Sequence, residues 1–121
     1  MTDMRNKLPV GIHLDSGGCA RKRSGAVTIA LNGQTSGSFN TGNASMVRIQ
    51  PWLRSSSDIA VLVSYTGSVN LTRFERALGA GDAVLDSVPA NSAVYWGCFN
   101  TTVPALQAGD EHDYLLVTFY E

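Results

Sequence analysis

Short stretches in which apolar and polar residues alternate recur along most of the chain. A period of two is typical of a strand with one face in a core and the other in solvent. Only 73–78 has a weak helical pattern, enough for about one or two turns. The alternation predicts strands at 26–31, 45–53, 58–65, 68–74, 83–88, 92–99 and 113–120.

Residues that favour turns separate these stretches. Asn32-Gly33 and Thr66-Gly67 are two examples, and further glycines stand at Gly42, Gly81 and Gly109. The 58–74 stretch, with its turn at Thr66-Gly67, is the best candidate for a β-hairpin. This rhythm predicts an all-β fold, a β-sandwich or jelly roll of about seven or eight short antiparallel strands.

Residues 1–24 differ from the rest, because they hold five of the nine Lys and Arg residues and a glycine-bearing stretch. We expect an N-terminal arm or extended segment there, followed by a single β-sandwich domain over 25–121. Within the arm, 8–14 alternates with a period of two, and Pro9 favours an edge strand because it cannot donate to a ladder. An edge strand can pair with a neighbouring subunit. The candidate partner-binding residues are Leu8, Val10, Ile12, Arg21, Lys22 and Arg23.

The basic run Arg21-Lys22-Arg23 could bind phosphate, an acidic protein surface or nucleic acid, although three charges in a loop are more often simply solvated. The formal net charge of −1 gives the whole chain no attraction to a polyanion. We therefore do not expect nucleic acid as a partner.

The composition supports a β domain outside the membrane. Charged residues make up 16% of the chain, with only two Lys and three Glu to populate exposed helix faces, while apolar residues make up 44%. The longest apolar run, Ile59 to Val63, is far too short to cross a bilayer. The N-terminus lacks the continuous apolar segment of a secretory signal, so we expect the chain to be made in a cytoplasm.

Two related hexapeptides precede predicted strands: ALGAGD at 77–82 and ALQAGD at 105–110. In both, glycine would supply a tight or left-handed conformation and aspartate would bond the turning backbone. We interpret them as one local turn used twice, since a repeat architecture needs at least three copies.

No pattern of residues indicates catalysis. The two histidines, His13 and His112, lie outside any known metalloprotease, hydrolase or phosphate-loop motif. We expect no enzyme activity, no catalytic residue and no cofactor. The segment 109–113 offers three carboxylates and an imidazole that could hold a metal ion, but a solvated turn explains it equally well, and we assign no metal site.

Cys19 and Cys98 are the only cysteines. A disulfide between them would close a long loop and stabilise the fold by about 3–5 kcal/mol. Without a CxxC or Cys/His spacing, two reduced and inert thiols are the favoured interpretation, and the pairing stays open.

The strand rhythm from Gly25 onward, the paired AGD strand entrances, the arm up to Ser24 and the final strand-like stretch DYLLVTFYE together resemble accessory virion proteins of tailed bacteriophages, of the capsid decoration or cement type. The resemblance implies a structural protein of the virion, made in the host cytoplasm. It would bind the major capsid protein or another virion protein and stabilise the shell, as a homo-oligomer such as a trimer. No residue roles follow from it, and such a role needs no active site.

A second hypothesis is a carbohydrate-binding module or tail adhesin. The apolar face of a sugar ring stacks on exposed aromatic side chains, and the candidates are Trp52, Trp96 and Tyr114. Tyr95 and Trp96 are adjacent and therefore point to opposite faces of their strand, so that one of the two is a candidate for exposure.

Overall fold

The computed structural model of the chain describes residues 12–14, 20–53 and 58–121, with side chains described from Lys22 onward. Over these residues it contains strands and no helix, so none of them forms a helix that could span a membrane. The strands are β1 (Ile12–Leu14), β2 (Ala20–Ala30), β3 (Ser36–Asn40), β4 (Met46–Trp52), β5 (Ile59–Ser64), β6 (Arg76–Leu78), β7 (Val84–Ser87), β8 (Ala93–Asn100), β9 (Ala105–Leu106) and β10 (Tyr114–Tyr120).

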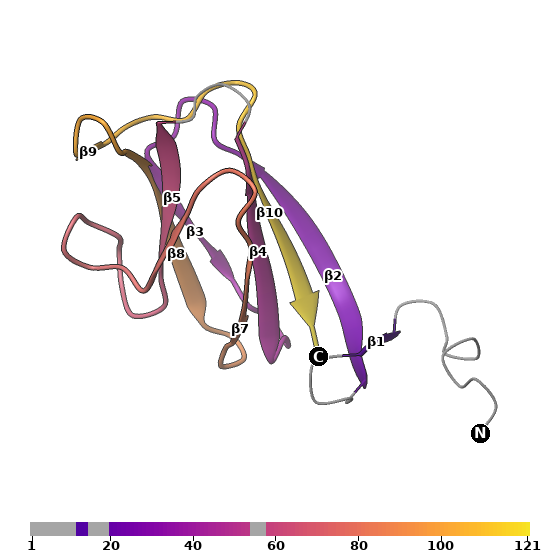
Figure 1. Cartoon of the computed structure of the whole chain (residues 1–121). Coiled ribbons are helices and arrows are strands. Elements are labelled where there is room, and N and C mark those ends of the chain that lie inside the picture. The colour runs from indigo at the N-terminus through magenta and orange to yellow at the C-terminus, as the bar shows by residue number, and fades with distance from the viewer. Residues whose placement is uncertain (1–11, 15–19, 54–57) are drawn as a thin grey trace.

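These strands form two facing antiparallel sheets, which confirms the predicted all-β sandwich (Figure 1). One sheet has the order β1-β2-β10-β4-β7, and the other has the order β3-β8-β5-β6, with β9 added against β8. Setting β1 and β9 aside, the orders β2-β10-β4-β7 and β3-β8-β5-β6 are those of an eight-stranded jelly roll. The chain therefore crosses repeatedly from one sheet to the other, and few strands pair with their neighbours in sequence.

The core lies between the two sheets and follows the period-two pattern of the sequence. Val47 and Ile49 of β4 are fully buried, while Arg48 between them is only half-buried. Trp96 of β8 is the largest fully buried side chain, and its ring occupies the space beside Gly37 of β3, where a Cβ atom would lie 2.6 Å from Trp96 Cζ2. The buried cluster consists of Leu31, Ala44, Val47, Ile49, Val61, Val63, Leu78, Val88, Val94, Trp96, Cys98, Leu115 and Val117.

The strand β5 is buried on both faces, because a second apolar layer covers the outer side of its sheet. Val61 and Val63 face the core, while Ala60 and Leu62 face outward beneath Leu71 and Phe74 of the loop that follows. This outer layer borders a partly open apolar hollow of about 270 Å³. The sequence of a strand does not show whether its second face is exposed or is covered by side chains from a loop, and β5 is covered in this way.

Two predicted elements are wrong. The stretch 68–74 forms a turn with one isolated bridge between Asn70 and Arg73 rather than a strand, so the predicted 58–74 hairpin does not exist. The strand β5 pairs instead with β6 at Arg76–Leu78, where the sequence suggested a helical turn. The chain also forms the strands β3 and β9, which the alternation did not indicate.

One side of the sandwich is closed by a polar contact between the sheets. Asp86 on β7 accepts hydrogen bonds from Arg76 Nη2 at 2.8 Å and Arg76 Nε at 3.0 Å, and a third from the Tyr65 hydroxyl. Arg76 and Tyr65 belong to the β5–β6 side of the other sheet, so these three residues join the edges of the two sheets. We call them the Asp86 clasp.

Candidate functional site

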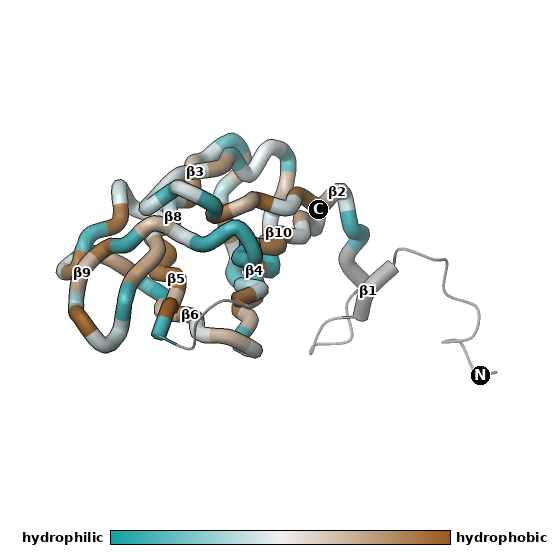
Figure 2. The backbone as a smooth tube through the Cα atoms, turned by 90° about the horizontal axis from the view of Figure 1, so that it is seen from above, coloured by the Kyte–Doolittle hydropathy of each residue, from teal (hydrophilic) through white to brown (hydrophobic). Residues whose placement is uncertain are grey.

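At its N-terminal end β2 extends past the rest of the sandwich (Figure 2), and there it pairs antiparallel with β1. The pairing of β10 with β2 ends at Tyr120 and Arg23, after which Glu121 N donates to the Lys22 carbonyl at 2.9 Å. Beyond that point β2 continues to Ala20 and pairs only with β1, within the part of the chain that the structure describes. The fold thus presents a short two-stranded ribbon to its surroundings.

The predicted partner-binding residues are partly placed on this ribbon. Ile12 pairs with Lys22 through the backbone, and Lys22 and Arg23 have exposed side chains. Of the predicted edge strand at 8–14, the structure describes only Ile12–Leu14, which form β1, the last of the described strands in its sheet. Leu8 and Val10 lie outside the described residues.

The strand β2 runs through the boundary that the sequence suggested between arm and domain. It begins at Ala20, so Arg21, Lys22 and Arg23 belong to a strand rather than to a loop. The local sequence is rich in small and charged residues, which strands disfavour, but pairing with β1 and then with β10 stabilises the extended conformation.

Over Arg23–Ala30, one edge of β2 pairs with β10 and the opposite edge meets no other described strand. Val27 lies opposite Val117, a core residue, and so faces the second sheet, yet 39% of its surface is exposed. A hollow of about 280 Å³, lined by Ser24, Phe119 and the 40–43 turn, lies nearby. Among the described strands, none continues the sheet on this side, whereas the Asp86 clasp closes the opposite side. The sequence carried one signal of this unpaired edge, the absence of charged residues over 24–30.

Two of the three predicted sugar-stacking residues lie together. Trp52 on β4 and Tyr114 on β10 are directly opposite one another, on the outer face of their sheet. Trp52 is 51% exposed and borders a hollow of about 320 Å³ with Gln50 and Leu53. The backbone pairing brings the two aromatic residues to one surface although they are far apart in the sequence.

Trp96 cannot be part of such a surface, and its inclusion among the sugar-binding candidates was wrong. Only 1% of its surface is exposed, and it packs between the sheets against Gly37. Of the adjacent pair Tyr95 and Trp96, it is Tyr95 that turns outward. The sequence predicted that Tyr95 and Trp96 point to opposite faces of their strand, but it did not show which of the two faces the core.

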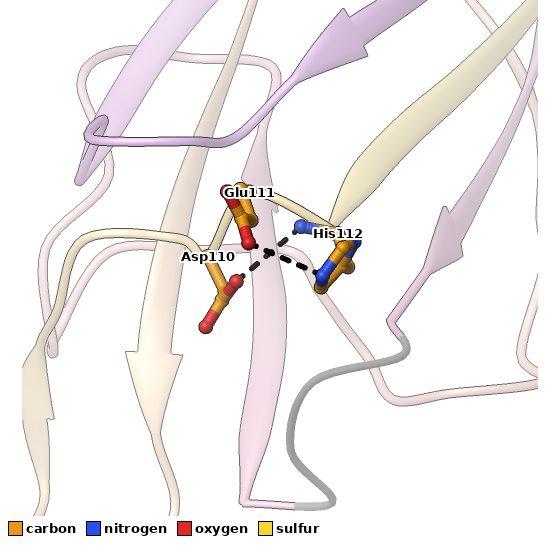
Figure 3. A group of neighbouring side chains, drawn as sticks. All are labelled: Asp110, Glu111 and His112. Carbon is orange, nitrogen blue, oxygen red and sulfur yellow. Dashed lines mark hydrogen bonds and ion pairs between the residues drawn. The ribbon is translucent and has the colours of Figure 1, made fainter.

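The acidic segment at 109–113 forms a turn in front of β10 (Figure 3). Asp110, Glu111 and His112 are all exposed, and one ligand atom from each lies within 4.8 Å of the others. His112 Nε2 lies 3.3 Å from Glu111 Oε1, and His112 N donates to Asp110 Oδ1 at 3.4 Å. These contacts are those of a solvated turn, and exposed acidic groups commonly gather in this way without a bound ion.

The third carboxylate of this segment has a separate role. Asp113 is fully buried, and its Oδ2 accepts a hydrogen bond from Asp110 N at 3.2 Å. Its carbonyl oxygen accepts from Leu31 N at 3.0 Å. Asp113 therefore fixes the turn and its junction with the end of β2, and does not face the same side as its three neighbours.

Cys98 has a buried free thiol in the core. Burial, and secondarily the charge of Asp113, raises the pKa of this thiol to about 11. A thiol of this kind stays protonated at neutral pH and is a poor nucleophile. Cys19 lies outside the described residues, so the pairing of the two cysteines remains untested.

Neither a protein-family model, nor a curated protein, nor a solved structure matches the chain. Its function has to be inferred from its own residues and from the surfaces that the fold presents.

Proposed function

We propose that the chain is a non-catalytic structural protein of a virus particle, made in the host cytoplasm, which binds the major capsid protein and stabilises the shell. The observation that carries this proposal is the β1–β2 ribbon, which overhangs the sandwich and ends in a strand with a free edge among the described strands. A projecting strand of this kind can add to the sheet of a neighbouring protein through backbone hydrogen bonds.

The fold is compatible with this role. Jelly rolls recur in viral capsid proteins, and also in lectins and cupins, so the topology supports the proposal by analogy and cannot decide it alone. A non-catalytic role is also compatible with the contacts of four ionisable residues. Asp86, Arg76 and Tyr65 bond one another across the sheets, and Cys98 lies in the core. Each of these residues has a structural use in the fold.

Electrostatics adds a second contribution at the ribbon. Lys22 and Arg23 are exposed where β2 leaves β10. Cations at the rim of an interface steer an acidic partner toward it and exclude partners of like charge. We therefore expect the capsid surface that receives the ribbon to be acidic and to present an open strand edge.

The first test measures attachment to shells assembled from the major capsid protein encoded in the same genome. We expect the purified chain to co-sediment with these shells, and Arg23→Glu to weaken its attachment by about tenfold, because a basic contact becomes a like-charge contact. Arg73→Glu is the matched control, since Arg73 is an exposed arginine on the loop before β6, away from the ribbon. Co-sedimentation that neither change affects, or no co-sedimentation at all, would count against the proposed function.

A second candidate function has a specific observation in its favour. Trp52 and Tyr114 form a cross-strand aromatic pair on the outer face, and the side chain of Gln50 accepts a hydrogen bond from Arg48 beside them. Stacking surfaces flanked by polar groups are typical of sugar sites. The alternative is therefore a carbohydrate-binding module or tail adhesin with its platform at Trp52.

A glycan array and tryptophan fluorescence distinguish this alternative. If it holds, a bound glycan should quench the fluorescence of Trp52, and Trp52→Ala should reduce glycan affinity by about two- to tenfold, since a stacked aromatic ring contributes about 0.5–1.5 kcal/mol. Leu85→Ala serves as control, because Leu85 is an exposed apolar residue on β7, in the same sheet. Failure of every glycan to bind would remove the alternative and leave the shell proposal standing.

A further inference from the structure

We infer that the open edge of β2 is a self-association site, at which two copies of the chain pair antiparallel about a two-fold axis at Val27. The two sheets would join through β2 and its counterpart into one continuous sheet. This contact between identical chains is centred on Val27, whereas the proposed contact with a capsid protein uses the β1–β2 ribbon together with the exposed Lys22 and Arg23 at its base.

The backbone directions along β2 identify the groups that are available. In an antiparallel ladder, alternate residues turn their N–H and C=O groups to one neighbour and the rest turn away. Leu31 N donates to Asp113 O and Glu121 N donates to Lys22 O, while Ser45 N donates to Tyr120 O on the other side of β10. The odd-numbered residues of β10 therefore face β2, and Ala26, Thr28 and Ala30 turn toward the open edge.

Within the described residues, the open edge of β2 has a limit at each end. At one end β1 already occupies the edge opposite Ala20–Lys22. At the other end Gln34 Nε2 donates to the Ala30 carbonyl at 3.0 Å, and the chain then turns away at Gly33, which has a φ of 76°. The segment between is the part of the edge that a further strand can pair with.

These limits select the register. With the axis at Val27, Ala26 of one copy lies opposite Thr28 of the other, and both residues turn their backbone groups toward the partner. The two symmetric pairs form four hydrogen bonds, and Ser24 meets Ala30. Moving the axis toward Gly25 would drive the end of the partner's β2 into β1, which holds that position.

Over 24–30 the edge carries neither of the two sequence features that normally prevent such pairing, which are charge and proline. Natural edge strands are usually protected by charged residues, proline or a covering loop. The residues over 24–30 are Ser, Gly, Ala, Val, Thr, Ile and Ala, with no charge or proline. In contrast, the opposite side of the sandwich is closed by the Asp86 clasp.

Self-pairing also covers an apolar surface that the single chain leaves exposed. Val27 faces the second sheet but is 39% exposed, and a hollow of about 280 Å³ is lined by Ser24 of the same strand and by Phe119 of β10. At the two-fold axis the Val27 side chains of the two copies would meet on this inner face. Cross-strand contacts between β-branched side chains stabilise sheets.

The first experiment measures molar mass in solution by light scattering as a function of concentration. We expect a dimer, with twice the mass of one 12.9 kDa chain. Thr28→Pro should weaken dimerisation by about tenfold or more, because two hydrogen bonds are lost and the proline rings obstruct the edge. Ser38→Pro on β3 is the matched control. Cys98 N donates to Thr35 O, so Ser38 also turns its N–H away from the neighbouring strand.

A crosslinking variant keeps the inference testable should either proline disturb folding. Two residues on the axis form a non-hydrogen-bonded pair, with Cα atoms about 4.5 Å apart, within the range that a disulfide spans. In a Cys19→Ser background, Val27→Cys should therefore give a covalent dimer when oxidised glutathione is added. Ser38→Cys, on another edge strand, should remain largely monomeric.

The outcomes separate this inference from the proposed function. A strictly monomeric protein that still attaches to shells would overturn the dimer and retain the shell role. A dimer that does not attach to shells would support the self-association and contradict the proposed shell role. A dimer or trimer that Thr28→Pro leaves intact and Val27→Cys does not crosslink would place self-association elsewhere, and would also contradict the inference.

Discussion

Gly109→Ala should lower the free energy of unfolding by about 3 kcal/mol, among the largest effects of any single methyl group in this chain. A Cβ atom at position 109 would lie 2.4 Å from Leu31 Cβ and 2.5 Å from the Leu31 carbonyl oxygen. One of these atoms is backbone and the other is the first atom of a fully buried side chain, so neither can rotate away. The junction between β2 and the turn before β10 would have to separate.

Gly33→Ala is the matched control for this prediction. Gly33 N donates to Gly109 O at 3.0 Å, so the two glycines belong to the same junction, but a Cβ atom at position 33 would meet nothing within 4 Å. Its cost is the left-handed backbone alone, about 1 kcal/mol. Equilibrium unfolding in urea measures both variants. If Gly109→Ala proved no more destabilising than Gly33→Ala, the close approach to Leu31 would be refuted.

The same comparison explains why the two AGD hexapeptides misled the sequence interpretation. At Gly81 the φ is 86°, and Asp82 Oδ2 accepts a hydrogen bond from Gly79 N, as a local turn requires. At Gly109 the φ is not positive, and glycine is needed for contact with Leu31 of a distant strand. The prediction that both segments lead into strands is correct, since β7 and β10 follow them. The prediction of one turn used twice is wrong, because tertiary contact decides the second.

The long core strands could be predicted because each carries its own signal. The strands β4, β5, β8 and β10 contain β-branched and aromatic residues at alternate positions, and turn residues flank them. The strand β3 could not be predicted from its sequence. Phe39 is its only apolar residue that packs against the core, and the position of Gly37 is filled by the ring of Trp96. The loop at 68–74 has the alternating sequence pattern of a strand, because Val69 packs over Gly97 and Leu71 packs over the outer face of β5. Alternation reports burial and does not distinguish a strand from a covering loop.

Some of the candidate surfaces could also be predicted from the sequence, and others depend on tertiary structure. Hydrophobic alternation identified the edge strand at Ile12–Leu14. Residue type brought Trp52 and Tyr114 into consideration but could not separate them from the buried Trp96. The open edge of β2 depends on which strand pairs with which, so the uncharged stretch at 24–30 was consistent with an edge but could not locate it. Among the described strands, the Asp86 clasp closes one side of the sandwich and the edge of β2 stays unpaired on the other, and the proposed self-association depends on this difference.

Asp86→Ala should lower the free energy of unfolding by about 2 kcal/mol at neutral pH, because the half-buried Tyr65 hydroxyl loses its partner and the two sheet edges lose their link. The pH dependence is also specified. The hydrogen bonds from Arg76 hold the pKa of Asp86 below its usual range, partly offset by burial and reinforced by Tyr65. A depressed carboxyl pKa contributes stability above about pH 4, which is lost as the pH falls through the folded-state value.

Asp86→Asn isolates this charge, since the amide keeps an acceptor oxygen. The stability difference between the natural chain and Asp86→Asn should be constant from pH 6 to about pH 5 and shrink toward pH 3. At alkaline pH the pH dependence of stability has the opposite direction, because it comes from the Tyr65 phenol and not from the Asp86 carboxylate. Burial and the bond to Asp86 raise the pKa of the Tyr65 phenol, so its contribution to stability is fully present below about pH 10 and is lost progressively as the pH rises from there through the raised folded-state value. Asp82→Asn, at an exposed carboxylate outside the clasp, controls for removal of one negative charge. A difference for Asp86→Asn that does not change between pH 6 and pH 3 would show that the clasp does not connect the sheets through an ionised Asp86.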